Sequence, residues 1–282
     1  MSRYENYKYL QVEVNEGIAL ITINRLEYNN GYDYAGHYEM TQIWNDIDHD
    51  PDVRVAVITG AGTKSFCDPR PVKGEEAGPL KHWFAMKKAD FFKVTAHRNE
   101  GPAIFYGIIN AEKPIIAAVN GDASGSGLAI AVLSDISVVS ETAELVDVHM
   151  GLGMAAGDNI AFWPIMCGLA KAKLIALTGG TIDGKEAERI GLVGRSVPQA
   201  QVLPVAMEYA RTIAKGPQYA VRFTKRAMNQ WLKLAGITAF DLSYALEQLT
   251  FYDVDMEEGY YAAIKGEEPQ FPSVKTAGPK HT

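Results

Sequence analysis

The chain has 282 residues, of which 47% are hydrophobic and 22% charged, and its formal net charge is −7 at pH 7. An apolar fraction of this size can fill the core of one large domain or of two modest ones. The acidic balance argues against nucleic acid or an anionic membrane surface as the main partner, because both require a basic face.

The cysteines and the N-terminal residues indicate the cellular compartment of the protein. Cys67 and Cys167 are the two cysteines, and neither lies in a CxxC or Cys/His cluster typical of a metal site. They form no disulfide framework, so we expect a reducing compartment. The opening MSRYENYKYLQVEV has no apolar segment behind a basic start, and no run of 18 apolar residues follows. The sequence therefore predicts a cytoplasmic protein without a metal site.

Strand and helix patterns alternate in the first half of the chain. Residues 9–15 and 18–24 alternate apolar and polar side chains around a Glu-Gly turn, which predicts a β-hairpin. Apolar residues at helical spacing predict a helix over 37–48, and VRVAVITGAG predicts a strand after it. Three further features follow: an amphipathic helix over 90–109, a buried strand in KPIIAAVNG, and a glycine-led helix with a strand over 125–140.

After Gly180 the pattern predicts helices alone. They cover residues 183–190, 203–215, 219–234 and 239–264. The last stretch, GEEPQFPSVKTAGPKHT, is rich in proline, glycine and charge, so we expect a loose tail. The chain is accordingly divided into a core over 1–200, a helical region over 201–266 and a tail over 267–282.

The segment VDVHMGLGMAAGDN carries the clearest chemical signal. His149 precedes Asp158 by nine residues, which fits no helical spacing, so the two side chains meet only if the chain reverses. Three intervening glycines make that reversal sterically possible. A carboxylate beside the imidazole would fix its tautomer and charge, as in many histidines that act as general bases. The alternative is that Asp158 caps a helix starting at Asn159 and that His149 is an ordinary loop histidine.

Three turns follow strands in the first two thirds of the chain. They read SFCDPRPV, GDASGSG and GLGMAAGDN. Backbone N–H groups of two neighbouring strand-to-helix turns can form an oxyanion hole, to which a helix N-terminus adds positive potential. The repeated order of strand, turn and helix is more specific than any one of these motifs.

The chain resembles the crotonase, or enoyl-CoA hydratase/isomerase, superfamily over almost its whole length. The motifs that carry the resemblance are GIALITINR, VRVAVITGAGTKSFCD, KPIIAAVNGDASGSGLAIAVLSDI and LTGGTIDGKEAERIGLV. The resemblance implies an α/β fold: a crotonase-like spiral of ββα units with a helical C-terminal region that builds trimers, often paired into hexamers. It also implies an oxyanion hole with the N–H groups of Arg70 and Ser126 as donors. The basic residues available for coenzyme A phosphates are Arg25 and the lysines at 73, 81, 87 and 88.

Two positions depart from the hydratases of this superfamily. Ala129 and His149 stand where those enzymes usually have glutamates, and the first turn reads DPRP, with prolines on both sides of Arg70. A histidine at the second position, followed by Asp158, resembles the β-diketone hydrolase branch. That resemblance implies that Glu247 joins His149 and Asp158 in catalysis.

The same branch implies the residues that contact the substrate. Its carbonyl-binding tryptophan falls on Tyr32, its second histidine falls on Ser126, and its Trp-Pro pair falls on Trp163 and Pro164. The sequence leaves other interpretations open for some of them. Glu247 lies among acidic residues and also fits an exposed helix face, Tyr28 or Tyr34 could replace Tyr32, and Trp163 also fits a core aromatic. The remaining histidines fit solvated positions, and KHWFAMKKADFF fits either a pocket wall or ordinary helix packing.

The function predicted from these residues is retro-Claisen hydrolysis of a small-molecule β-diketone, which we expect to be cyclic. His149, oriented by Asp158, takes a proton from a water that Glu247 also holds, and Tyr32 or Ser126 polarises the second carbonyl. No metal or organic cofactor is needed. The alternatives are a coenzyme A thioester enzyme (a hydratase, isomerase, decarboxylase or thioester hydrolase) and a structural trimer subunit without activity.

Overall fold

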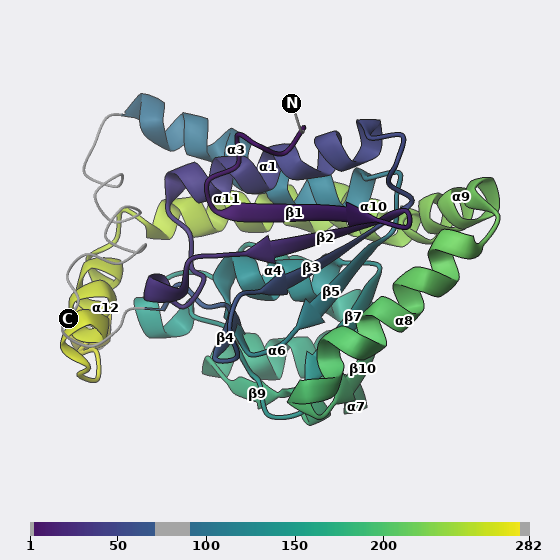
Figure 1. Cartoon of the computed structure of the whole chain (residues 1–282). Coiled ribbons are helices and arrows are strands. Elements are labelled where there is room, and N and C mark those ends of the chain that lie inside the picture. Colours follow the sequence, from purple (N-terminus) through teal and green to yellow (C-terminus); the bar gives the residue numbers. More distant parts are fainter. Residues whose placement is uncertain (1–2, 71–90, 277–282) are drawn as a thin grey trace.

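The computed structural model describes residues 3–70 and 91–276. Its strands form two sheets (Figure 1). The large sheet has the spatial order β1 (Leu10–Asn15), β2 (Ile18–Ile23), β3 (Val55–Gly60), β5 (Ile115–Val119), β7 (Ile136–Ser140) and β10 (Arg195–Val197). The small sheet has the order β4 (Ser65–Cys67), β6 (Asp122–Ser124), β8 (Glu144–Val146) and β9 (Thr181–Asp183).

The chain visits the two sheets in turn. The pairs β3 and β4, β5 and β6, and β7 and β8 each place the first strand in the large sheet and the second in the small one. Helix α3 (Phe91–Asn110) follows the first pair and α4 (Gly125–Leu133) follows the second. This repetition is the ββα spiral of the crotonase-like fold, as the sequence predicted.

The N-terminal hairpin also forms as predicted. Strands β1 and β2 pair antiparallel, with Asn15 opposite Ile18. The two turn residues, Glu16 and Gly17, have φ values of 52° and 82°. Two-residue hairpins favour such left-handed turns because they match the twist of the strands.

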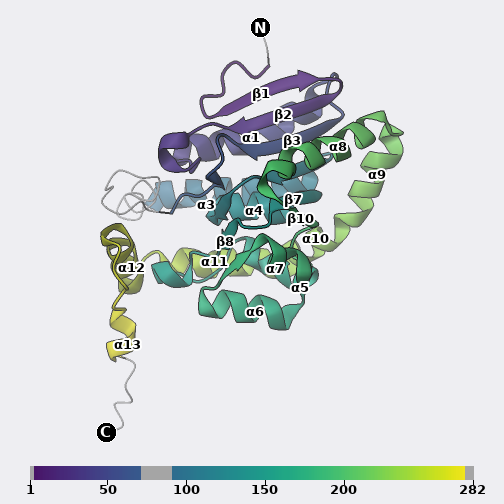
Figure 2. The same ribbon diagram turned by 60° about the horizontal axis from the view of Figure 1, so that its bottom comes forward.

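The remaining elements are mostly helical. They are η1 (Leu26–Tyr28), α1 (Tyr34–His49), η2 (Met150–Leu152), η3 (Asn159–Phe162), α5 (Trp163–Cys167), α6 (Leu169–Thr178), α7 (Gly184–Arg189), η4 (Gln199–Gln201), α8 (Val202–Lys215), α9 (Gln218–Met228), α10 (Gln230–Ala235), the π-helical η5 (Gly236–Phe240), α11 (Asp241–Thr250), α12 (Val254–Lys265) and α13 (Pro272–Thr276). In Figures 1 and 2, α9 and α12 lie at opposite ends of the molecule, with α10 and α11 between them.

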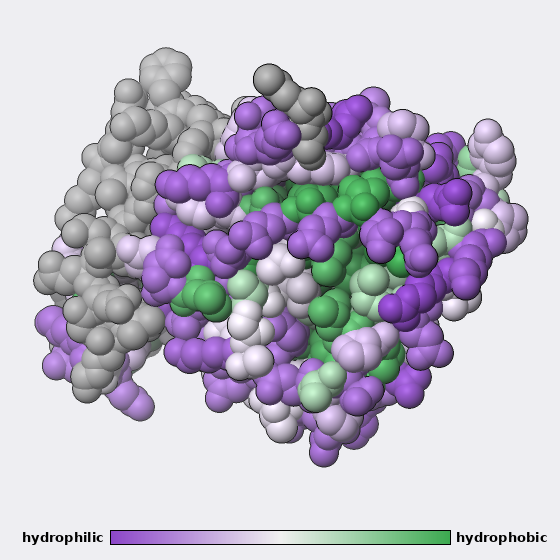
Figure 3. All heavy atoms as spheres, in the orientation of Figure 1, coloured by the Kyte–Doolittle hydropathy of each residue, from purple (hydrophilic) through white to green (hydrophobic). Residues whose placement is uncertain are grey.

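Both faces of the large sheet are covered. Val55 and Val57 pack with α8, which presents a stripe of small residues spaced four apart (Val202, Ala206, Ala210 and Ala214). The alternate residues Ala56 and Ile58 face the main core, to which α1, α3 and α4 contribute. Burial on both sides explains why the strands read as continuous apolar runs. Figure 3 shows mostly polar residues on one face of the molecule, with apolar residues in a band that crosses the strands of this sheet.

The second half of the chain differs from the expectation of helices alone. Strands β9 and β10 lie after Gly180, and each has three residues, which is too short for a strand pattern to be recognised. The predicted helix over 239–264 is divided into α11 and α12. Helix α11 ends at Thr250, and the Asp253 side chain caps the start of α12. The part of the expected loose tail that the structure describes contains α13, which is tied to α12 by a 2.9 Å hydrogen bond from the Ser273 N–H to Asp255.

None of the helices in the described ranges is both long and apolar enough to cross a membrane. Several C-terminal helices nevertheless present apolar side chains to solvent. On α11 the buried residues are Tyr244 and Glu247, whereas Leu242, Leu246 and Leu249 are 64%, 49% and 68% exposed. A row of this kind on the outer face of a helix is typical of a surface that a partner covers.

We therefore predict that the chain self-associates through the outer face of α11. Light scattering after size exclusion is expected to give a mass that is a multiple of 30.8 kDa. Leu246→Asp should lower that mass, because it places a charge in the contact, whereas Leu26→Asp, at an equally exposed leucine of η1, should not. A monomeric wild type would contradict the prediction.

Candidate active site

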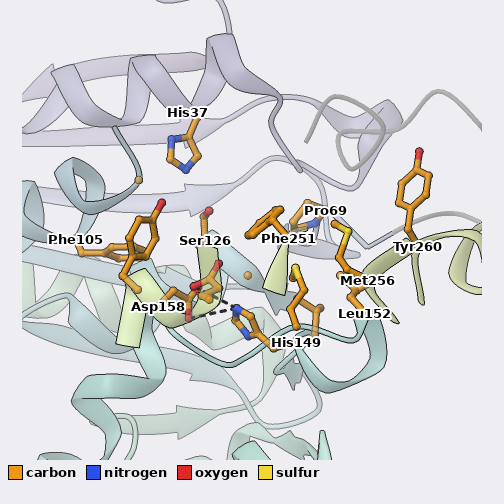
Figure 4. Close-up of a pocket in the computed structure, with 16 residues that line it drawn as sticks. His37, Pro69, Phe105, Ser126, His149, Leu152, Asp158, Phe251, Met256 and Tyr260 are labelled. Carbon is orange, nitrogen blue, oxygen red and sulfur yellow. Dashed lines mark ion pairs between the residues drawn. The ribbon is translucent and has the colours of Figure 1, made fainter. Parts of the chain in front are cut away.

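A cavity of about 120 Å³ lies beyond the ends of the small-sheet strands β4, β6 and β8, and residues of α1, α3, α4, α11 and α12 also line it (Figure 4). Polar and apolar residues share its wall. The polar ones include His37, Ser126, His149, Asp158, Tyr244 and Glu247, and the apolar ones include Phe105, Val148, Leu152, Met154, Phe251 and Met256. A mainly apolar cavity with a few convergent polar groups is the usual form of a small-molecule site.

His149 is held by a residue that the sequence analysis missed. Its Nδ1 lies 2.5 Å from Oδ1 of Asp147, and its backbone N–H donates to the same oxygen at 3.2 Å. Asp147 directly follows β8, so the end of the small sheet fixes the ring. Nδ1 therefore carries the proton that Asp147 accepts, and Nε2 faces the cavity. The D-x-H spacing was a usable signal, because residues two apart in an extended segment point to the same side.

Asp158 and Glu247 lie on the other side of the ring. Nε2 of His149 is 3.8 Å from Oδ1 of Asp158 and 3.9 Å from Oε2 of Glu247. The structure thus brings together the three residues that the sequence singled out as catalytic. Their arrangement corrects one detail: Asp147 makes the orienting hydrogen bond expected of Asp158. Asp158 also occupies the N-cap position of η3 that the alternative assigned to it, although its side chain makes no geometric capping hydrogen bond there.

Two glycines allow this convergence. Gly153 ends η2 in a left-handed conformation, with φ of 68°, and turns the chain back after His149. At Gly157 a Cβ atom would lie 2.2 Å from the backbone oxygen of Ser243 on α11. Only glycine permits that close approach of the two backbones. A 2.6 Å hydrogen bond from the Ser243 hydroxyl to the Gly157 carbonyl also stabilises it. The loop and α11 are thereby close enough for Glu247 to reach His149, and Glu247 is 6% exposed instead of lying on an outer face.

A buried chain of hydrogen bonds fixes Asp158. The Asn159 amide donates to Oδ1 of Asp158 at 2.7 Å, and the Trp163 indole N–H donates to Oδ1 of Asn159 at 2.7 Å. Trp163 is fully buried. Trp163 was expected to bind the substrate, but the structure gives it a structural role. Its indole N–H fixes Asn159, which in turn fixes Asp158.

The charges of this cluster displace its pKa values. Burial alone would lower the pKa of His149, but the charge of Asp158 and the hydrogen bond to Asp147 outweigh that effect and raise it to about 10. Burial raises the pKa of Glu247 to about 8, against the opposing charge of His149. Burial also raises the pKa of Asp158. The raised pKa favours the imidazolium form of His149, whereas the sequence analysis expected the neutral ring to act as the base.

Ser126 stands on the wall of the cavity in the first turn of α4. N–H groups at this position have no partner within the helix, and the helix N-terminus favours negative charge. The Ser126 N–H is therefore suited to an oxyanion.

The first turn is arranged differently from the expected oxyanion hole. The Arg70 N–H donates to Oδ1 of Asp68 at 3.2 Å, and the Arg70 side chain forms an ion pair with Asp68 at 2.8 Å. Asp68 also accepts the Ser124 hydroxyl at 2.7 Å. Pro69 fixes the backbone between Asp68 and Arg70, so that the carboxylate closes the turn on itself. The turn reaches the cavity through Pro69, and the Arg70 N–H is occupied by Asp68.

His37 lines the cavity, whereas Tyr32, which the sequence analysis expected to contact the substrate, is buried beside it and is not among the residues of the cavity wall. Their rings pack edge to face, with centroids 5.8 Å apart. The Tyr32 hydroxyl is buried, and burial raises the pKa of Tyr32 well above its usual value, partly offset by the nearby Ser126 side chain. His37 is 4% exposed and lines the cavity, so its expected solvated position was wrong, whereas His49 is exposed as expected. The sequence analysis expected a solvated His37 because polar residues lie near it in the sequence.

Of the basic residues expected to contact coenzyme A phosphates, Arg25 lies among those whose side chains the structure describes. Arg25 lies over the rings of Tyr9 and Tyr28 and forms a 3.0 Å ion pair with Asp33, so its charge is already matched. The lysines at 73, 81, 87 and 88 and the aromatic residues of KHWFAMKKADFF lie outside the residues whose side chains are described, as do the histidines at 82, 97 and 281. Among the side chains that are described, no group of three or more His, Cys, Asp or Glu is arranged to hold a metal ion.

Comparison with known proteins shows the class of the chain. A family model described as enoyl-CoA hydratase/isomerase matches residues 13–273. The (E)-benzylidenesuccinyl-CoA hydratase of Thauera aromatica is 35% identical over 217 residues, which cover 77% of this chain and 80% of that protein. The chain therefore belongs to the enoyl-CoA hydratase/isomerase family.

Solved structures share the fold. An enoyl-CoA hydratase/isomerase from Mycobacterium paratuberculosis is 30% identical, with a TM-score of 0.82 over 92% of this chain and 99% of that one. A β-diketone hydrolase from Anabaena sp. PCC 7120, bound to (S)-3-oxocyclohexyl acetic acid, is 24% identical, with a TM-score of 0.79 over 90% and 98% of the two chains. At that identity the second likeness establishes the fold alone.

The raised pKa of Glu247 predicts how stability depends on pH. The folded protein binds a proton at Glu247 up to about pH 8, whereas the unfolded chain releases it near 4.5. The contribution of this bound proton to the free energy of unfolding is therefore complete below pH 4.5 and is lost as pH rises through 8. Glu247→Gln, which cannot titrate, should flatten the decline of the free energy of unfolding across this window.

Urea unfolding at several pH values measures the effect. Glu208→Gln, at an exposed glutamate of α8, is the matched control and should keep the wild-type slope. An unchanged slope in Glu247→Gln would show that Glu247 titrates normally in the folded protein.

Proposed function

We propose that the chain adds water to the double bond of an α,β-unsaturated acyl-coenzyme A thioester. The observation that carries this proposal is the pair of buried carboxyl groups, Asp158 and Glu247, at 3.8 and 3.9 Å from one ring nitrogen of His149. Hydration needs one group to take a proton from water and another to give a proton to carbon. The hydratase relative from Thauera aromatica supports the same class of reaction.

The surroundings of the two carboxyl groups suggest their roles. Asp158 accepts a hydrogen bond from Asn159, which favours its ionised form, whereas Oε2 of Glu247 is buried without a hydrogen-bond partner among the described residues. Asp158 is therefore the base and Glu247, with a pKa of about 8, the acid. The imidazolium of His149 stabilises the ionised Asp158, and Asp147 holds it in place.

Asp158 takes a proton from water while the water oxygen bonds to the β-carbon of the substrate. The electrons of the carbon-carbon double bond move to the thioester oxygen. The Ser126 N–H donates to that oxygen, which carries the enolate charge. Glu247 then gives its proton to the α-carbon, and a proton passes from Asp158 to Glu247 before the next turnover. No metal or organic cofactor takes part in this scheme.

The scheme accounts for the two missing glutamates. Ala129 is fully buried in α4 and has no acidic group to offer, and the raised pKa of His149 favours its cationic form. The acidic groups come instead from the loop and from α11, and both reach the same point in the cavity. A structural subunit without activity is not favoured, because the cluster is assembled on the wall of a cavity.

Hydrolysis of a β-diketone is the second candidate. The observation that favours it is the Asp147 and His149 pair, since an imidazolium facing the cavity can protonate the carbon that leaves when a carbon-carbon bond breaks. Asp158 would again activate water, which would attack one carbonyl, and the other carbonyl would accept the electrons of the broken bond. The products would be a carboxylic acid and a ketone.

Two assays separate the candidates. With short unsaturated acyl-CoA thioesters we expect loss of the conjugated ultraviolet absorbance and a product heavier by one water. With cyclic 1,3-diketones and no coenzyme A we expect no ring opening. Ring opening without thioester hydration would establish the second candidate in place of the first.

The role of Asp158 is tested by substitution. Asp158→Asn keeps the shape but cannot accept a proton, and should lower kcat about 10²- to 10⁴-fold. Glu208→Gln, far from the cavity on α8, should leave kcat unchanged. Full activity in Asp158→Asn would mean that another group activates the water.

A further inference from the structure

Tyr244 forms the cavity wall next to Glu247. These two buried residues of α11 lie three positions apart, so they share the inner face of the helix. Tyr244 is 5% exposed and lines the cavity, as Gly101 of α3 does. A Cβ atom at Gly101 would overlap the Tyr244 hydroxyl. The tyrosine side chain therefore reaches from α11 to the backbone of α3 beside the cavity.

A cluster of aromatic rings holds this wall in place. Tyr244 stacks on Phe240 with ring centroids 5.7 Å apart, and Phe105 packs edge to face against the same ring at 5.3 Å. Phe162 also contacts Phe240, at 5.2 Å, and Phe240 is fully buried. Protein cores are close-packed, so a ring fixed on several sides does not move without disturbing its neighbours. Gly101, Phe105 and Tyr244 consequently form one end of the cavity, which we call the aromatic end.

The opposite end of the cavity is built differently. In Figure 4, Phe105 lies on one side of Asp158, and Leu152 and Met256 lie on the other. Phe105 and Tyr244 belong to the main hydrophobic core, whereas Leu152 and Met256 belong to a small separate cluster that includes residues of α12. Helix α12 lies at one end of the molecule (Figures 1 and 2). The aromatic end is therefore the one that the core supports.

This difference orients an acyl thioester in the cavity. Coenzyme A is far larger than a cavity of about 120 Å³, so the thioester has to lead from the cavity to the surface. Because the core lies behind the aromatic end, the thioester leads out past the opposite end. The substituent on the β-carbon then points towards Tyr244 and Phe105.

The volume of the cavity limits the length of the acyl group. A cavity of about 150 Å³ holds one molecule of benzene, so a cavity of about 120 Å³ holds an acyl group of about five carbons. The carbonyl, α- and β-carbons take up most of this number. Room is left for a substituent of about two carbons on the β-carbon.

We propose that Tyr244 sets the maximum length of the acyl group, and that the substrates are thioesters of unsaturated acids of about four or five carbons. The inference rests on the proposed function, because it takes an acyl thioester as the ligand. Tyr244 acts through the size of its ring and is a specificity-determining residue. A longer acyl group would have to displace the Tyr244 or Phe105 ring from the packed cluster.

Binding of saturated acyl-CoA ligands tests the proposal without turnover. Calorimetry compares the propionyl, butyryl, pentanoyl, hexanoyl and octanoyl thioesters. The wild type should gain about fourfold in affinity with each carbon up to pentanoyl, because each carbon fills apolar space. It should bind the octanoyl thioester about tenfold more weakly than the pentanoyl thioester, because the longer chain overfills the cavity.

Substitutions at the aromatic end complete the test. Tyr244→Leu removes the ring and should bind octanoyl at least as tightly as pentanoyl, whereas Tyr244→Phe keeps the ring and should keep the wild-type limit. Tyr38→Leu, at an exposed tyrosine of α1, is the matched control and should keep the limit too. Thermal melting shows whether each variant is folded. If Tyr244→Leu does not fold, Phe105→Leu enlarges the same end from α3 and should remove the limit in its place.

The results separate this inference from the proposed function. Octanoyl binding as tight as pentanoyl binding in the wild type, or an unchanged limit in the folded variant, would overturn the role of Tyr244 even if hydration is found. A limit that the substitution removes, together with no hydration of any short unsaturated thioester, would support the role of Tyr244 and overturn the proposed reaction.

Discussion

The structure of the site depends on the burial of one histidine ring, that of His149, among carboxyl groups that raise its pKa. The His149 ring is enclosed with three carboxyl groups, of which Asp147 bonds to one ring nitrogen and Asp158 and Glu247 lie near the other. Burying a charge is unfavourable unless partners compensate it, and three carboxylates around one imidazolium compensate it in excess. The excess is relieved by a proton on one of the carboxyl groups. An acid and a base are thus present together at the same nitrogen, which is the condition that adding water requires.

The fold holds this cluster from three directions. Asp147 directly follows β8 of the small sheet, the segment from β8 to η3 carries His149 and Asp158, and α11 brings Glu247. These parts are far apart in sequence, and their contact depends on Gly157, which leaves no room for a side chain against α11. The Trp163 and Asn159 hydrogen bonds then fix Asp158 from behind. If α11 also forms the contact between subunits, self-association will stabilise the helix that carries Glu247.

The sequence predicted the fold more fully than the site. Long apolar runs such as VRVAVITG and the periodic helices were recognised, whereas β9 and β10 were missed because three residues carry no periodicity. The meeting of His149 with Asp158 followed from the glycine-rich spacing, but Glu247 was assigned through family resemblance, since its helix looks exposed in sequence. Asp147, His37 and the internal bond of Arg70 depend on which neighbours the tertiary structure supplies. Local sequence does not contain that information.

Nuclear magnetic resonance of the His149 ring nitrogens at neutral pH tests the account most directly. We expect an imidazolium, with protons on both nitrogens and the Nδ1 proton shifted far downfield by its short bond to Asp147. Asp147→Asn should lower the pKa of the ring from its value of about 10. A neutral His149 ring in the wild type would contradict the account, because the cluster would then lack the charge that supports its acid and its base.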